Sequence, residues 1–254
     1  MKNKVQGVNN SEEKEFLEQF EQLCRGRSAW EAWADLMAAM ACWISTAADH
    51  SSEHFEKRKK EAKTCMEKLG SEEIVQTMLT IVADALDKNP EQDFLGGLYM
   101  RLNLGDHWTG QFFTSYCISH LMAEMLMGDC GKEIEEKGWT SIYDPCIGGG
   151  AMMLAAVNVM QSKGIAYQNQ ALFAGQDIDR IAAMMAYIQL SLRGCAGYIV
   201  VGNSLTHPMS GDVLFPHEGE GQELWLMPMF MNNIWNMRRI AAVIGNLERI
   251  GDKG

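Results

Sequence analysis

Short apolar runs and longer helical stretches alternate in the second half of this chain. The runs Ser141–Tyr143, Ala171–Ala174 and Tyr198–Val201 are each followed by turn residues, as β-strands are. The stretches 151–160 and 179–192 between them have the length and composition of helices. Strand, helix, strand, helix, strand at this spacing forms a parallel sheet with crossover helices, so this half of the chain is restricted to an α/β fold.

The first half carries a different pattern. From residue 11 to about residue 128, apolar side chains recur at helical spacing, as in Phe16, Leu17 and Phe20. A helix that begins at Ser71 stops near Pro90, because proline disfavours helical geometry in the residue before it. We therefore expect a helical N-terminal domain over residues 1–105 and an α/β domain over residues 106–254.

Each predicted strand ends in small or polar residues. Asp144 and a glycine-rich turn follow the first strand, Asp177 ends the second, and Asn203 follows the third. The carboxyl ends of parallel strands are where ligands bind in such sheets. A glycine turn lets a ligand approach the backbone, and a carboxylate accepts hydrogen bonds from both ribose hydroxyls. Together these features predict a site for a nucleoside-containing cofactor; the simpler alternative is a tight turn with a capping aspartate.

Several ordered segments resemble one enzyme family. Asp144-Pro145-Cys146-Ile147-Gly148-Gly149-Gly150 resembles the D-P-x-x-G-x-G turn of S-adenosylmethionine-dependent N6-adenine DNA methylases. The likeness is to the modification subunit of type I restriction systems and its phage or plasmid relatives. Further segments similar to that family are 93–96, 110–114, 175–179 and 202–205. The resemblance implies a Rossmann-like class I methyltransferase sheet with S-adenosylmethionine as cofactor.

The resemblance also implies roles for individual residues. Thr114 would meet the methionine end of the cofactor, Asp177 would take the ribose hydroxyls, and Ile178 would lie on the adenine face. Asn203 stands where the family has aspartate and would accept from the adenine amino group through its carbonyl oxygen. The implied cofactor-binding residues are Gln111, Phe112, Phe113, Thr114, Asp144, Pro145, Gly148, Gly150, Asp177, Ile178 and Asn203.

The chain departs from the family at the catalytic segment. These methylases carry N-P-P-F or D-P-P-Y at the end of the fourth strand, where it holds the amino group of a flipped base. The nearest stretches here are 211–217 and 226–230, and the second has Met227 in place of the amide. A thioether cannot orient an adenine amino group, so we assign no catalytic residue. His217 is a candidate base only by its residue type.

Three functions follow from this pattern. The first is S-adenosylmethionine-dependent methylation of adenine N6 in DNA. The second is a noncatalytic pseudo-methyltransferase that binds the cofactor and regulates or partners another protein. The third is another enzyme that uses S-adenosylmethionine, with His217 or Asp212 recruited. Only four strands are plausible, so we expect a truncated, parallel sheet whose open edge is covered by the final helix, a second copy or a protein partner.

Composition and charge limit the partners, metal sites and cellular locations that this chain can have. The net charge of −11 disfavours indiscriminate phosphate binding, although a local basic face could still bind DNA. The basic run 57–60 is interleaved with glutamates and predicts a solvated helix. Seven scattered cysteines without a C-x-x-C pair indicate reduced thiols, a cytoplasmic location and no zinc site. The longest apolar run, Leu36–Ile44, is too short to span a membrane.

Overall fold

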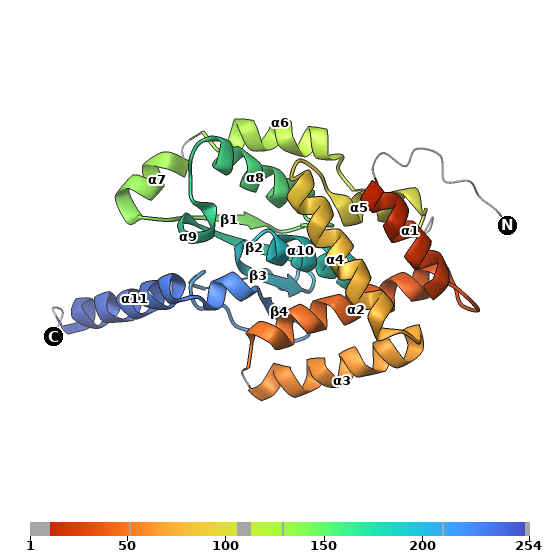
Figure 1. Ribbon diagram of the computed structural model, residues 1–254. Helices are drawn as coiled ribbons and strands as arrows, with labels where there is room; N and C mark the ends of the chain where they lie inside the picture. The colour runs from red at the N-terminus through yellow and green to blue at the C-terminus, as the bar shows by residue number, and fades with distance from the viewer. Residues whose placement is uncertain (1–10, 51, 106–112, 129, 210, 252–254) are drawn as a thin grey trace.

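The computed structural model describes residues 11–50, 52–105, 113–128, 130–209 and 211–251. Among these residues, seven helices precede the first strand, and the sheet lies in the second half of the chain (Figure 1). The helices before the sheet are α1 Ser11–Leu23, α2 Ala29–Ala48, α3 Ser52–Leu69, α4 Glu72–Lys88, α5 Phe94–Arg101, α6 Tyr116–Leu126 and α7 Cys130–Lys137. The later elements are β1 Thr140–Asp144, α8 Ala151–Ser162, α9 Tyr167–Gln170, β2 Ala171–Asp177, α10 Arg180–Leu192, β3 Ala196–Val201, β4 Glu223–Leu226, η1 Pro228–Met231 and α11 Asn233–Gly251.

Side-chain caps explain where several helices begin. Ser28 and Glu31 form a capping box at the start of α2, which satisfies backbone N–H groups that have no partner within the helix. Ser71 caps α4, Asp93 caps α5 and Asp179 caps α10 through the same kind of hydrogen bond. These polar residues therefore fix the positions at which the chain enters its helices.

The four strands lie in the order β1-β2-β3-β4. β1, β2 and β3 are parallel, which confirms the predicted βαβαβ unit and the α/β fold class with its helical N-terminal region. The expectation of a fourth parallel strand was wrong, because β4 pairs antiparallel with β3. The described residues between β3 and β4, 202–209 and 211–222, form no helix. A loop connection can reverse the strand direction, whereas a crossover helix preserves it.

Each face of the sheet packs against a different set of elements. Phe173 and Ile199 point into a core shared with α8, α10 and the N-terminal helices. Leu172 and Tyr198 point to the other face and pack with Phe230 of η1 and Trp235 of α11. α2 packs directly on α10, and α6 packs on α8 (Figure 1). One continuous apolar core thus joins the first hundred residues to the sheet.

A buried arginine adds a polar connection between the two parts. Arg58 of α3 donates to the Ser45 hydroxyl at 2.6 Å and to the Leu224 carbonyl of β4. Its guanidinium lies 4.1 Å from the ring centroid of Trp225 and 3.7 Å from the Asp49 carboxylate. Arg58 is only 4% exposed, so the prediction that its basic run is a solvated helix face was wrong at this residue.

Candidate cofactor site at the strand ends

Two carboxylates lie on one face of the sheet at its carboxyl edge. Asp144 ends β1 opposite Gly175, two residues before Asp177 ends β2. Side chains two residues apart on a strand point to the same face. Asp144 contributes to raising the pKa of Asp177, as a nearby negative charge does. The structure therefore brings together the two carboxylates that the sequence singled out.

The glycine turn is held by the carboxylate of Asp177. The Gly148 N–H donates to Asp177 Oδ2 at 2.8 Å, and the Asp179 N–H donates to Oδ1 at 2.8 Å. Asp144 Oδ1 accepts from the Cys146 N–H at 3.0 Å at the start of the same turn. A carboxylate has about four lone-pair directions, so Asp177 keeps acceptor capacity for a ligand after both of these bonds.

Glycine is required at two positions of this turn. Gly148 has φ +56° and Gly150 has φ +97°, values that residues with a side chain rarely adopt. A Cβ on Gly148 would lie 3.2 Å from the Phe113 ring, and one on Gly150 would lie 3.2 Å from the Ala186 Cα of α10. The turn therefore combines a left-handed backbone with close approach of two neighbouring segments.

Burial shifts both strand-end carboxyl groups. It raises the pKa of Asp144 above its usual value of 3.8, and the hydrogen bond from the Cys146 N–H opposes the shift. It likewise raises the pKa of Asp177, again against the N–H donors that favour the charged form. These carboxylates are thus held in a partly desolvated place where a cationic or hydrogen-bond-donating ligand would relieve the cost of burial.

A buried glutamine that no sequence motif marked connects the turn to the N-terminal helices. Gln189 of α10 donates to Asp93 Oδ1 and to the Gly149 carbonyl, both at 2.8 Å. Its side-chain oxygen accepts from the Leu95 N–H at 3.1 Å. The segment 93–96, noted only for its family likeness, is therefore connected to the glycine turn through Gln189. The only signal in the sequence was a glutamine among the apolar residues of the predicted helix 179–192. In the structure Gln189 is fully buried, and buried polar groups are hydrogen-bonded.

A cleft of about 690 Å³ adjoins this junction. Asp93, Phe113 and Thr114 line it together with residues of α1, α4 and α5. Phe113 also packs against Tyr99, with ring centroids 5.5 Å apart, and Thr114 is exposed. Gln111 and Phe112, which were predicted beside them, lie outside the described residues.

Three further predicted residues lie at the strand ends. Ile178 is 70% exposed directly after Asp177, an unusual exposure for an isoleucine beside a buried strand. Asn203 Oδ1 accepts from the N–H groups of Leu205 and Thr206, at 2.9 and 3.2 Å. Both lone pairs of this amide oxygen are in use, so the predicted contact with an adenine amino group requires the turn to rearrange. Pro145 lies exposed at the start of the glycine turn.

The stretches nearest to a catalytic segment lie elsewhere. Met227 and Phe230 are 0% and 2% exposed and are part of the core. His217 and Tyr198 line a separate cavity of about 180 Å³. Tyr198 points to the face of the sheet opposite Asp177, so His217 does not converge with the two carboxylates. Asp212 accepts from the Leu214 N–H at 2.9 Å within its own turn.

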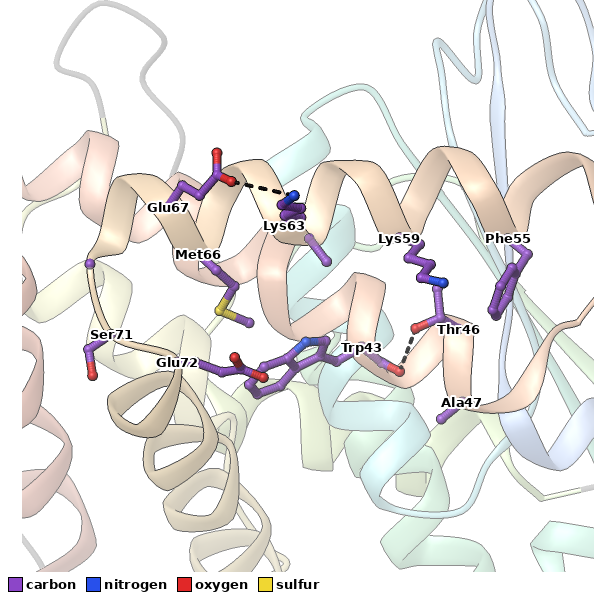
Figure 2. Close-up of a pocket in the computed structure, with 12 residues that line it drawn as sticks. Trp43, Thr46, Ala47, Phe55, Lys59, Lys63, Met66, Glu67, Ser71 and Glu72 are labelled. Atoms are coloured by element: carbon purple, nitrogen blue, oxygen red, sulfur yellow. Dashed lines mark hydrogen bonds and ion pairs between the residues drawn. The ribbon is translucent and has the colours of Figure 1, made fainter.

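A larger groove, of about 800 Å³, lies between α2, α3 and the start of α4 (Figure 2). Trp43 and Met66 give it apolar walls, and Lys63 pairs with Glu67 at 3.9 Å along its rim. The Thr46 hydroxyl bonds back to its own helix at the Cys42 carbonyl, at 2.8 Å. Lys63 and Glu67 pair with each other and Thr46 bonds to its own helix, so these polar groups already have partners, and we assign the chemistry to the strand ends instead.

The described residues contain neither a candidate membrane-spanning helix nor a cluster of metal ligands. None of their helices is long and apolar enough to cross a membrane. No group of three or more histidine, cysteine, aspartate or glutamate side chains among them could hold a metal ion.

The chain is similar to known proteins over part of its length. The curated methylase subunit of the type I restriction enzyme MjaIX from Methanocaldococcus jannaschii is 27% identical over 144 residues. The match covers 57% of this chain but only 23% of that subunit, so this chain corresponds to less than a quarter of its relative. A solved putative class I S-adenosylmethionine-dependent methyltransferase from Listeria monocytogenes aligns with a TM-score of 0.41 and 15% identity, covering 79% of this chain and 57% of the other.

The sequence model that describes N-6 DNA methylases matches residues 100–237. This range covers more than half of the chain and includes all three parallel strands, the glycine turn and both strand-end carboxylates. The resemblance drawn from the sequence motifs is confirmed: the chain belongs to the N-6 DNA methylase family.

Proposed function

We propose that the protein binds S-adenosylmethionine at the carboxyl ends of β1, β2 and β3. The observation that carries this proposal is the placement of Asp144 and Asp177 on one face, with the glycine turn tied to Asp177 through the Gly148 N–H at 2.8 Å. Membership of a DNA methylase family supports the same cofactor. A ligand with ribose hydroxyls and a positive charge matches two partly buried carboxylates.

The residues of this chain fit that group. Asp177 keeps free acceptor directions for the ribose hydroxyls, and the exposed Ile178 beside it offers an apolar surface to the adenine ring. Gly148 and Gly150 let the turn pack closely against Phe113 and α10, and the turn is held beside Asp177 by the Gly148 N–H. Phe113 and Thr114 would flank the methionine end, where the cleft adjoins the turn.

The bound cofactor would supply an electrophilic methyl group on a sulfonium centre. The carboxylate of Asp144 would contribute negative charge near that cationic group, and Gln189 would hold the turn in place through the Gly149 carbonyl. The chain itself thus binds, orients and partly desolvates the ligand.

Titration calorimetry with S-adenosylmethionine tests the proposal. We expect binding to the unmodified chain and at least about a tenfold weaker affinity for Asp177→Ala, because the main ribose acceptor is removed. Asp87→Ala, which changes an exposed carboxylate on α4, is the matched control and should bind like the unmodified chain. Absence of heat with the unmodified chain, under conditions where it is folded, would refute the proposal.

A noncatalytic role is the second candidate, and one observation favours it over methyl transfer. Met227 and Phe230, in the stretch nearest to a catalytic segment, are packed in the core. The family makes adenine N6 in DNA the substrate to test. Incubation with methyl-labelled cofactor and plasmid DNA separates the two candidates: label in the DNA supports methyl transfer, whereas cofactor binding without label supports a regulatory or partner-binding module.

A further inference from the structure

The final helix α11 is attached to the body along one side of its first turns. Trp235 is fully buried and donates to the Gln168 carbonyl at 3.0 Å. Arg238 donates to the carbonyls of Gly138 and Asn169, and Arg239 donates to the Phe230 carbonyl at 2.9 Å. Beyond this anchor, α11 extends away from the sheet and the other helices (Figure 1).

The other side of α11 is apolar and exposed. Met237, Ile240, Ile244 and Leu247 are 64%, 53%, 51% and 63% exposed. Their spacing of three, four and three residues is that of the seam of a coiled coil. A solvated helix of this length is marginal in water unless an apolar face is packed, so this stripe indicates a helical partner.

We propose that the partner is α11 of a second copy of this chain, packed antiparallel about a two-fold axis. In that arrangement Met237 of one copy meets Leu247 of the other, and Ile240 meets Ile244, so each side chain of the stripe has an apolar counterpart. The arginines that anchor α11 lie on the side that faces the body. They therefore stay outside the seam, and no charged side chain of the described stripe is buried by the pairing.

The exposed area supports a second copy as the occupant. Ile234 and Val243, at 39% and 46% exposed, extend the stripe on its two flanks. Six roughly half-exposed side chains of this size offer on the order of 600 Å² per copy. The pair would bury about 1,200 Å² in total, which is the lower end of the range for specific protein interfaces.

A second exposed stripe, on α6, is the rival surface. It comprises Ile118, Leu121, Met122, Met125 and Leu126. α6 is shorter than α11 and lies flat on α8, with Ser119 and Ala123 facing inward. α11 extends away from the body beyond its anchor, whereas α6 packs along α8 (Figure 1), so α11 is the better candidate for pairing of two helices.

Sedimentation equilibrium of the full chain over the micromolar range tests this inference. We expect a reversible dimer, and Ile244→Glu should raise its dissociation constant more than about 100-fold, because the pairing would bury two carboxylates at its centre. Leu121→Glu on α6 is the matched control and should leave dimerisation unchanged. Circular dichroism checks that both variants keep their helix content, and Met237→Glu provides an independent substitution in the stripe.

The other outcomes would overturn the inference. A monomer at every concentration, loss of the dimer in Leu121→Glu but not in Ile244→Glu, or assemblies larger than a dimer would each exclude the proposed two-fold pair. The test does not involve S-adenosylmethionine, so its result is independent of whether the strand-end site binds that cofactor.

Discussion

At the scale of single residues, the shape of the strand-end site depends on backbone that only glycine adopts easily. Gly150 combines φ +97° with a contact to α10, whereas Gly164, at φ +75°, has open space around its Cα. The two positions therefore share a conformational cost, and only the first also has a steric one. This difference makes them a matched pair for substitution.

We expect Gly150→Ala to lower the free energy of unfolding by about 2–4 kcal/mol and Gly164→Ala by about 1 kcal/mol. The additional loss at Gly150 reflects the Ala186 Cα, only 3.2 Å from the new Cβ. Urea denaturation of both variants at one protein concentration measures the difference. Equal losses of unfolding free energy at the two positions would mean that α10 shifts to accommodate the new Cβ without an energetic cost.

The strand-end carboxylates should respond to acid in two opposite ways. As the pH falls, their contribution to folding stability should rise, while their affinity for the ligand should fall. Burial raises the pKa of both Asp144 and Asp177 above 3.8, so the folded chain holds these protons more tightly than the unfolded chain. Their contribution to stability therefore increases as the pH falls through the raised pKa values towards the unfolded value. Binding of a cation or of ribose hydroxyls requires the charged carboxylates and should weaken over the same interval.

Calorimetry with S-adenosylmethionine at a series of pH values from neutral down towards 4 measures the binding part of this prediction. We expect affinity to fall while circular dichroism still reports a folded chain. Asp144→Asn should bind more weakly at neutral pH and show a shallower pH dependence, because one of the titrating groups is gone. An affinity that stays constant until the chain unfolds would contradict the role given to these carboxylates.

At the scale of elements, local sequence predicted the parallel part of the sheet better than its edge. β1, β2 and β3 each end in a turn with polar or glycine residues, and these signals lie within a few residues of the strand. The direction of β4 depends on how the loop 202–222 folds over the sheet, which no short pattern records. Arg58 shows the same limit, because its burial arises from contact with Leu224, 166 residues away in the chain.

The candidate site divides in the same way. Asp144 and Asp177 could be placed at one edge from the strand order alone, since parallel strands end on the same side. The hydrogen bonds of Gln189 could not be predicted in this way, because they join α10 to Asp93, which lies 96 residues earlier in the chain. The sequence also could not predict that the Asn203 oxygen accepts hydrogen bonds within its own turn. An asparagine after a strand can either bond to the nearby backbone or face a ligand.

The contact of Arg58 in α3 with β4 can be tested by substitution. We expect Arg58→Met to lower the free energy of unfolding by about 3–5 kcal/mol, because it removes buried hydrogen bonds to Ser45 and Leu224 and the cation that faces Asp49. Lys59→Met, an exposed neighbour in the same basic run, should change it by less than about 0.5 kcal/mol. Chemical denaturation measures both. A small effect at Arg58 would mean that packing of the methionine on Trp225 compensates for the lost polar contacts.

At the scale of the whole molecule, the helices and the sheet share one interior. The main apolar core includes Phe16 and Trp33 of the first two helices as well as Phe173 and Ile199 of the sheet. Residues 1–105 and 106–254 remain a prediction of domain organisation from the sequence. A continuous core across that boundary argues that the two parts stabilise each other, and that neither exposes its inner face without the other unfolding.

We therefore expect thermal unfolding as one cooperative transition that shifts as a whole when the cofactor binds. Tryptophan fluorescence reports on Trp33 in the N-terminal helices and on Trp225 and Trp235 around the sheet. Far-ultraviolet circular dichroism reports on the helices. The two unfolding curves should coincide at a fixed protein concentration. S-adenosylmethionine at about 100 times its dissociation constant adds about 2.7 kcal/mol to the stability of the folded state, which raises Tm by about 5 °C for a chain of this size. Asp177→Ala should unfold in one transition but show a smaller shift at the same cofactor concentration. Two separate transitions, with the cofactor moving only the second, would instead show that the strand-end site belongs to a part of the chain that is stable without the N-terminal helices.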